Sequence, residues 1–273
     1  MATITTADIK RVREITGAGM SDVKAALVAA DGDHQHAIDA LRMKGEAKAL
    51  ERGAGRTASN GIVASAGGAL IELACETDFV AKNERFQQLA NEIVAHAAAT
   101  SIGDTPRLLQ EKLTDGATIE QSIVALSAAI REKLELRRVV VMSGKVATYL
   151  HRRASDLPPQ IGVLVEFTGD DVDAARGAAM QVASLGAQYV SREEVPADAV
   201  AKEREIAEAT AKEEGKPEAV RSKIVEGRVQ GFFKEVVLLE QTSVRDSKQS
   251  VKAMLNAAGV TVTRFARFEV GRA

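Results

Sequence analysis

The spacing of apolar residues along this 273-residue chain alternates between a helical and a strand-like period. Near the N-terminus, apolar positions recur every three or four residues in three short runs, which predicts three short helices. Ile9, Val12 and Ile15 should share the inner face of the first helix, and Gly17 is expected to end it. Ser21 and Asp33 are expected to cap the second and third helices. A bundle this small buries little surface, so docking is its expected use.

From residue 60 the period becomes two, and a hairpin turn is predicted at 66–68. Ile71, Leu73 and Cys75 should share one face of the second strand. Thr118 is expected to open a later helix with a capping box. In order, the predicted elements are strands at 62–65 and 69–75, a helix over 86–97, two helices within 108–136, and strands at 139–142 and 146–150.

A second cycle repeats the order of strand, connection and helix. A strand at 161–167 and a helical stripe over 175–183 are joined by the short polar connection 168–171. The repetition indicates two duplicated half-domains, each with an antiparallel sheet, and therefore an α+β fold. Strands at 235–239 and 261–270, with a helix over 248–258 between them, are expected to complete the second sheet.

Between these elements, residues 197–230 are highly charged and carry only a thin apolar stripe. A break at 215–217 predicts two antiparallel helices, a hairpin arm that projects from the body. Such an arm is either a solvated projection or an interaction surface. The predicted domains are a three-helix domain (1–45), a linker (46–59), a first half-domain (60–150), a second half-domain (151–196 and 231–273) and the arm (197–230).

Composition narrows the class of protein. A formal net charge of −2 argues against a general nucleic-acid binder, because such proteins are normally basic. Cys75 is the one cysteine and sits among apolar residues, so we expect a buried, inert thiol in a reducing cytosol. The N-terminus lacks the pattern of a signal peptide, and no apolar run approaches the length of a membrane span. We therefore expect a cytoplasmic protein that does not enter a membrane.

Residues 76–83 are unusual for a connection between a strand and a helix. Small polar residues are typical there, yet Asp78 is followed by Phe79 and Val80. Either the aromatic ring folds into its own core, or another protein covers it. The plain connection at 168–171 indicates that the fold does not need this sequence.

Signatures of enzyme chemistry are missing from the sequence. It has no G-x-x-x-x-G-K-[ST] loop and no G-x-S-x-G elbow, and its four histidines show no metal-ligand spacing. Glu76 and Asp78 are close enough to form a carboxylate pair, but neighbouring acids in loops are common. We therefore expect no catalytic residue, no cofactor and no metal.

Three separated motifs carry a resemblance to a known family. They are T-G-A-G-M at 16–20, C-E-T-D-F-V-A-K-N at 75–83 and V-E-G-R at 225–228. Together they closely resemble bacterial elongation factor Ts, and the resemblance runs from about residue 9 to residue 271. It implies a non-enzymatic exchange factor that binds elongation factor Tu, GDP-bound or nucleotide-free, with an N-terminal bundle of the ubiquitin-associated type.

The resemblance also implies site residues. Asp78 and Phe79 would enter between two helices of the partner's nucleotide-binding domain. The implied wedge consists of Thr77, Asp78, Phe79 and Val80, and the other implied partner contacts are Lys10, Arg13, Met20, Tyr149 and His151. Ser21 stands where many family members have a second methionine, which weakens an apolar contact there. Contacts between two copies through the arm are a further expectation.

Two other functional classes stay open at this point. A helical adaptor would hold a partner without affecting its nucleotide. A small-molecule enzyme would need a polar pocket that the sequence does not reveal.

Overall fold

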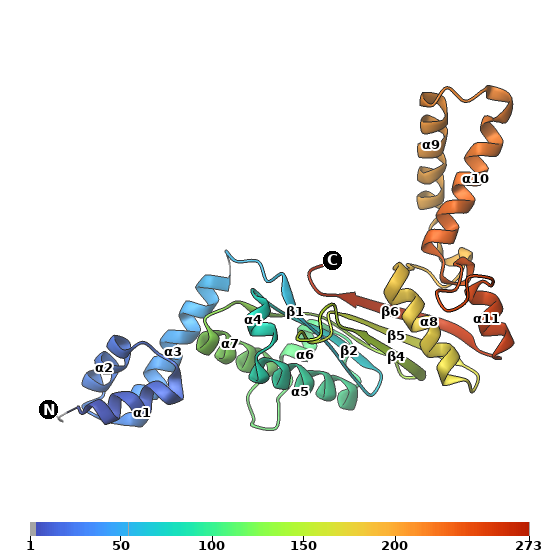
Figure 1. Cartoon of the computed structure of the whole chain (residues 1–273). Helices are drawn as coiled ribbons and strands as arrows, with labels where there is room; N and C mark the ends of the chain where they lie inside the picture. The colour runs from blue at the N-terminus through green and yellow to red at the C-terminus, as the bar shows by residue number, and fades with distance from the viewer. Residues whose placement is uncertain (1–3, 54, 273) are drawn as a thin grey trace. The chain divides into compact units, whose positions relative to one another are not determined.

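The computed structural model describes residues 4–53 and 55–272, so the parts of the expected domains at 1–3, 54 and 273 lie outside the described residues (Figure 1). The chain divides into two compact units. Unit 1 holds the chain up to Val141, the segment Arg152–Gln160 and the stretch from Phe268; unit 2 holds Met142–His151 and Ile161–Arg267. No helix among the described residues is long and apolar enough to cross a membrane.

Three helices form the start of unit 1: α1 (Thr6–Thr16), α2 (Met20–Ala29) and α3 (His34–Gly53). Val12, Val23 and Leu27 are fully buried at their centre, whereas Ile15, expected on the inner face, is 52% exposed. Gly17 ends α1 with a left-handed φ of 66°, and the Asp33 carboxylate accepts a hydrogen bond from the His36 amide at the start of α3, so both predictions are confirmed. The Ser21 prediction was wrong, because α2 begins at Met20, one residue earlier, and Gly19 is its N-cap.

The first sheet has the order β1-β2-β3, with β1 (Asn60–Ala66), β2 (Ala69–Cys75) and β3 (Leu134–Val141) all antiparallel. Ile71, Leu73 and Cys75 share one face, as predicted, and their cluster includes Phe86 and Ile93 of the covering helix. The helices of this half are α4 (Asp78–Ala81), α5 (Glu84–Thr100), α6 (Thr105–Leu109) and α7 (Ile119–Ile130). The Thr118 capping box at the start of α7 is confirmed.

The second sheet is ordered β4-β5-β6, with β4 (Lys145–His151), β5 (Ile161–Thr168) and β6 (Thr261–Glu269). It belongs to unit 2 except for the last two residues of β6. Helices α8 (Val172–Leu185) and α11 (Val251–Ala257) pack into its core. Asp171 caps α8, so the second connection is an ordinary helix start. β4 pairs antiparallel with β5 and not with the first sheet, so the chain enters unit 2 at Met142, before the expected boundary at residue 150.

The strand expected at 235–239 is absent, which corrects that prediction. The Val237 amide donates to the Phe233 carbonyl, so the helix continues to Val236, and a 3-10 turn (Leu238–Glu240) follows. A short apolar run fits a buried helix end as well as a strand, and here the buried neighbours favour the helix. Only β6 therefore completes the second sheet.

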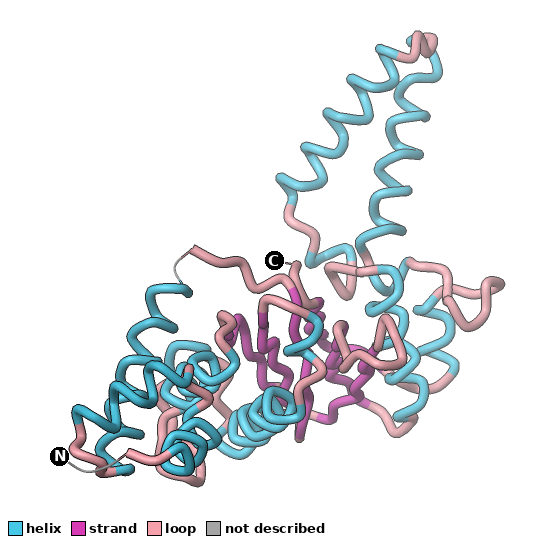
Figure 2. The backbone as a smooth tube through the Cα atoms, turned by 60° about the vertical axis from the view of Figure 1, so that its left-hand side comes forward, coloured by secondary structure: helices cyan, strands magenta, loops and turns pink. Residues whose placement is uncertain are grey.

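The arm consists of α9 (Ala197–Glu213) and α10 (Glu218–Val236), and Figure 2 shows the two helices side by side. Ala207, Ala211 and Val225 form its buried seam. Two ion pairs bridge the helices, Arg204 to Glu226 at 3.0 Å and Arg228 to Glu214 at 2.7 Å. A short 3-10 turn (Arg192–Glu194) lies at its base, where Arg192 pairs with Glu240.

Buried Glu72 ties the end of the chain to the first sheet. A β-bulge between Glu72 and Leu73 lets the consecutive residues Arg137 and Arg138 both reach the Glu72 carboxylate, at 3.4 and 2.7 Å. The same carboxylate accepts the Gly271 amide at 3.3 Å, and Arg138 also donates to the Arg272 carbonyl at 2.8 Å. Three donors therefore contact the buried carboxylate of Glu72.

Replacing Glu72 with Ala should destabilise unit 1 by about 3 kcal/mol, because two arginines would lose their buried partner. Calorimetry should show a melting temperature lower by roughly 6–12 °C. Glu135→Ala is the matched control, since Glu135 lies on the neighbouring strand in longer, exposed ion pairs with Lys133 and Arg137. Equal melting temperatures for the two variants would contradict this role for Glu72.

Candidate functional site

The connection from β2 to α5 forms a short helical turn, α4, which presents one aromatic ring to solvent. Phe79 is 79% exposed, more than any other large apolar side chain in the described part of the chain. Its neighbours Val80 and Ala81 are 7% and 0% exposed and belong to the core cluster of the first sheet. Phe79 is thus not folded into its own core, and Val80 anchors the turn from below instead of offering a surface.

Two carboxylates hold the N-terminal end of this turn. The Glu132 carboxylate accepts hydrogen bonds from the Thr77 amide at 3.0 Å and from the Thr77 hydroxyl at 2.7 Å. In return, the Glu76 carboxylate accepts the Lys133 amide at 2.6 Å. Cys75 pairs with Leu134 at the end of the β2–β3 ladder, and these side-chain hydrogen bonds connect the next two residue pairs, Glu76 with Lys133 and Thr77 with Glu132. We call this arrangement the carboxylate clamp.

The clamp also shapes the turn itself. Thr77 is the N-cap of α4, and its hydroxyl oxygen accepts a hydrogen bond from the Val80 amide at 3.4 Å. At the other end, the Gln87 side chain donates to the Ala81 carbonyl at 3.0 Å. Asn83 then caps α5 directly. A turn of four residues is not stable alone, so these contacts explain why it forms.

Asp78 takes part in a chain of charges on the surface. The Lys82 ammonium lies 3.3 Å from the Asp78 carboxylate and 2.7 Å from the Asp156 carboxylate. The two carboxylates raise the pKa of Lys82, with Asp156 contributing most, and Lys82 lowers the pKa of Asp156. Asp78 therefore stands beside Phe79 with a defined partner.

Cys75 lies directly beneath the turn and is fully buried, as predicted. Burial, together with the negative charge of Glu132, raises the pKa of the thiol to about 12. Since the thiolate is the reactive form, burial keeps Cys75 in its unreactive thiol form at neutral pH.

The remaining implied contact residues lie in two other places. Lys10 and Arg13 are exposed on α1, and Met20, at the start of α2, is 63% exposed. In unit 2, the rings of Tyr149 and His151 stack at a centroid distance of 6.2 Å along β4. The structure thus presents three separate sets of side chains: on the bundle, on α4 and on β4.

Sequence reasoning missed Glu132 and Asp156. Both act on residues far away in the sequence, and a single acid before a strand or within a loop carries no local signal of such a role. Glu76 was noticed only as a neighbour of Asp78, whereas its actual partners are Arg56 and the Lys133 amide.

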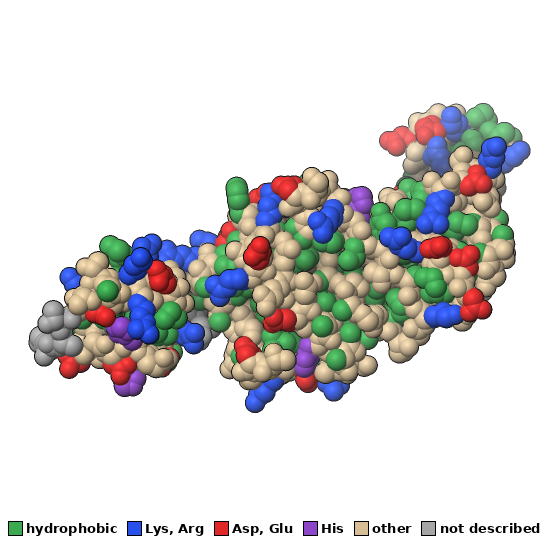
Figure 3. All heavy atoms as spheres, turned by 60° about the horizontal axis from the view of Figure 1, so that its bottom comes forward, with side chains coloured by type: hydrophobic (Ala, Val, Ile, Leu, Met, Phe, Trp, Pro, Cys, Tyr) green, Lys and Arg blue, Asp and Glu red, His purple; other side chains and the backbone are tan. Residues whose placement is uncertain are grey.

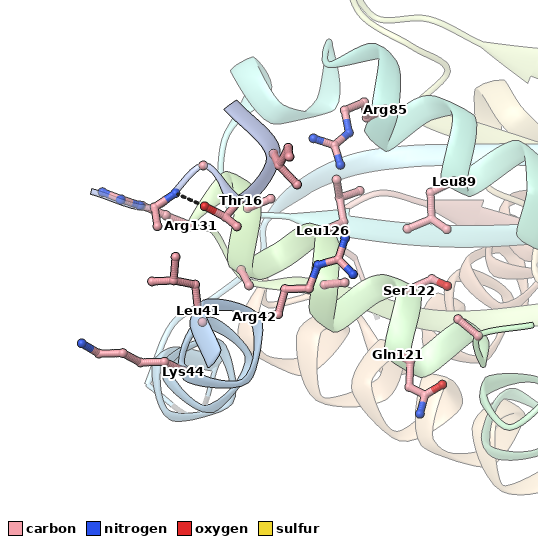
Figure 4. A pocket seen from close by; sticks show the side chains of 18 of the residues that line it. Thr16, Leu41, Arg42, Lys44, Arg85, Leu89, Gln121, Ser122, Leu126 and Arg131 are labelled. Atoms are coloured by element: carbon pink, nitrogen blue, oxygen red, sulfur yellow. Dashed lines mark hydrogen bonds between the residues drawn. The ribbon is translucent and has the colours of Figure 1, made fainter. Parts of the chain in front are cut away.

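Unit 1 also contains an open groove of about 780 Å³. Arg42 of α3 and Arg85 of α5 extend into it above an apolar floor that includes Leu89 and Leu126 (Figure 4). In the part of the chain that the structure describes, no group of His, Cys, Asp or Glu is arranged to hold a metal ion. On the face shown in Figure 3, acidic and basic side chains intermingle, without a large field of one sign.

Comparison with known proteins identifies the family. A family model described as "Elongation factor TS" matches residues 76–272. Curated proteins named elongation factor Ts from Mycolicibacterium gilvum and Mycobacterium tuberculosis are 60% and 58% identical to this chain, and each alignment covers both proteins completely. The protein of that name from Saccharopolyspora erythraea is 58% identical, again over the full length of both. With the exposed turn of α4 and the motif around it, these similarities show that the chain belongs to the elongation factor Ts family of translation factors.

Proposed function

We propose that this protein binds elongation factor Tu and promotes the release of GDP and its exchange for GTP, with Phe79 acting as an apolar wedge. Membership of the elongation factor Ts family supports the partner and the exchange activity. The exposed ring on a clamped turn is the observation that supports the wedge. The proposal involves no covalent chemistry, cofactor or metal of this chain.

Exposure of Phe79 destabilises the free protein, and burial of the ring against a partner would offset this. Burying a phenylalanine side chain stabilises a protein by about 2 kcal/mol, and the free protein forgoes most of this. Insertion between apolar elements of the partner would recover it. The exposure of Phe79 is a specific feature of the turn, because its neighbours Val80 and Ala81 on the same turn are packed in the core.

Stiffness is the second requirement of a wedge. A flexible loop would lose conformational freedom on binding, and that loss would subtract from the free energy available to distort the partner. The carboxylate clamp, the buried Val80 and the Gln87 contact order the turn before the partner arrives. Binding free energy is then available to displace the elements that hold magnesium and phosphate.

Asp78 would act beside the ring. A carboxylate brought close to bound phosphate groups disfavours them electrostatically, and it can also accept hydrogen bonds from the partner. In the free protein its carboxylate is paired with Lys82 at 3.3 Å.

The other two sets of residues would supply affinity. Lys10, Arg13 and Met20 on the bundle, and Tyr149 and His151 on β4, are proposed to contact the partner away from the nucleotide. Contacts between two copies through the arm stay a prediction. Ile206 and Val220, both about half exposed, are large apolar side chains on the arm that such a contact could bury.

Phe79→Ala should reduce the acceleration of GDP release by about 10- to 100-fold at a saturating concentration of the factor, because the wedge is lost. Stopped-flow fluorescence of a labelled GDP on elongation factor Tu measures this rate. Leu185→Ala is the control, since Leu185 is also a large, 52% exposed apolar side chain but lies outside the proposed contacts. If Phe79→Ala is as fast as wild type, the wedge is refuted; if wild type gives no acceleration, the exchange function itself is refuted.

Glu132→Gln should slow GDP release by roughly fivefold without removing any group that faces solvent beside Phe79. The amide keeps the shape of the side chain, but it is uncharged and its nitrogen cannot accept a hydrogen bond. The two hydrogen bonds from the Thr77 amide and hydroxyl therefore cannot both be kept. The same stopped-flow measurement tests this, with Glu135→Gln as control. Unchanged rates for Glu132→Gln would mean that the clamp does not contribute to exchange.

Exchange also requires reciprocal binding. If the factor weakens GDP binding by a given ratio, GDP must weaken factor binding by the same ratio. Calorimetric titrations of elongation factor Tu with and without GDP should therefore give factor affinities that differ by that ratio. Tight binding that is indifferent to GDP would favour the adaptor alternative.

A further inference from the structure

We propose that Asp156, acting through Lys82, positions the wedge turn of α4, so that the segment Arg152–Gln160 serves as a brace for it. The inference rests on the proposed exchange function and adds to it a positioning residue outside the sequence motif of the turn. Lys82 is the C-cap of α4, where the clamp at Thr77 exerts no direct hold.

The brace belongs to unit 1, although the chain on both sides of it belongs to unit 2. Its last residues are fixed against the first sheet and the end of the chain. The Val63 amide donates to the Pro159 carbonyl at 2.8 Å, and the Val270 amide donates to the Gln160 carbonyl at 2.9 Å. At its start, Arg153 pairs with the buried carboxylate of Glu269. The segment is thus anchored on both sides of Asp156.

From this anchored segment, Asp156 contacts the turn. Its carboxylate lies 2.7 Å from the Lys82 ammonium, which lies 3.3 Å from Asp78. Lys82 is about one-third exposed and Asp156 about two-thirds, so this pair adds little to global stability. Its effect is to restrict the position of the turn. Because Asp156 holds the Lys82 ammonium, the C-terminal end of α4 cannot move without breaking this ion pair.

The two ends of the turn are therefore fixed by different parts of the chain. Glu132, before β3, holds Thr77 at the N-terminal end, and Asp156 holds Lys82 at the C-terminal end. The brace begins directly after His151, which is itself a proposed contact residue on β4. One continuous stretch of chain would thus carry a partner contact and the support of the wedge.

The test compares Asp156→Asn, Lys82→Met and the double variant with wild type. Asp170→Asn is the matched control, because Asp170 is also an exposed aspartate held by a lysine, Lys145, at 2.8 Å, but lies in unit 2. Hydrogen exchange of the amides of residues 78–83 is measured on the free protein, and GDP release from elongation factor Tu is measured over a range of factor concentrations.

We expect faster amide exchange at residues 78–83 in all three variants and a maximal rate of GDP release lower by roughly three- to tenfold. The half-saturating concentration of the factor should stay within about twofold of wild type, because Asp156 acts on the turn and not on the partner. The double variant should be no slower than Lys82→Met, because Lys82→Met already breaks the ion pairs with both Asp156 and Asp78. Lys82→Arg, which keeps the positive charge, should retain most of the wild-type rate of GDP release that Lys82→Met loses.

Asp156→Asn behaving like Asp170→Asn in both measurements would overturn the brace. A raised half-saturating concentration with an unchanged maximal rate would also overturn it, because it would show a direct contact with the partner. If the wild-type protein does not accelerate GDP release, the proposed exchange function is refuted. Amide hydrogen exchange of the free protein then still shows whether Asp156 orders the turn.

Discussion

The candidate site depends on an exchange of hydrogen bonds between two carboxylates at the end of the β2–β3 ladder. Glu132 receives the amide and hydroxyl of Thr77, and Glu76 receives the amide of Lys133. Backbone pairing would otherwise stop at Cys75 and leave the following residues to fray. The side-chain hydrogen bonds extend the pairing of the two strands by two more residues, into a turn too short to form alone. The turn that carries the exposed phenylalanine is thereby attached to a strand that is buried along its whole length.

This strand is β2, which begins after the hairpin and ends at Cys75. One of its faces packs on α5. The carboxylate of Glu72, in the same strand, binds Arg137, Arg138 and the Gly271 amide. The same strand therefore organises the core, fixes the end of the chain and leads directly into α4. Since interiors are close-packed, a displacement of this strand would be felt at the turn. The site is precise because it continues a strand with little freedom to move.

Local patterns predicted much of the fold. The stripe over α5, the hairpin before β2, the left-handed Gly17 and the capping box of Thr118 all depend on residues close in sequence. Apart from the cap of α2, the misses concern partners that are distant in sequence. β4 pairs with β5 across a long loop, and the apolar residues at 235–239 end a helix because of what packs around them. For the site, the motif located Phe79, but the outward ring and inward Val80 follow from the helical turn, and Glu132 is brought there only by folding.

The inert thiol of Cys75 has a practical consequence for studying the motion of this protein. It is the chain's one cysteine, it is fully buried, and burial raises its pKa to about 12. Maleimide and similar reagents react with thiolates, so the folded native chain should remain unlabelled at neutral pH. A cysteine introduced on the arm or the bundle would then be the single site that takes a dye or spin label. The natural background already suits distance measurements, and the thiol beneath the turn need not be removed.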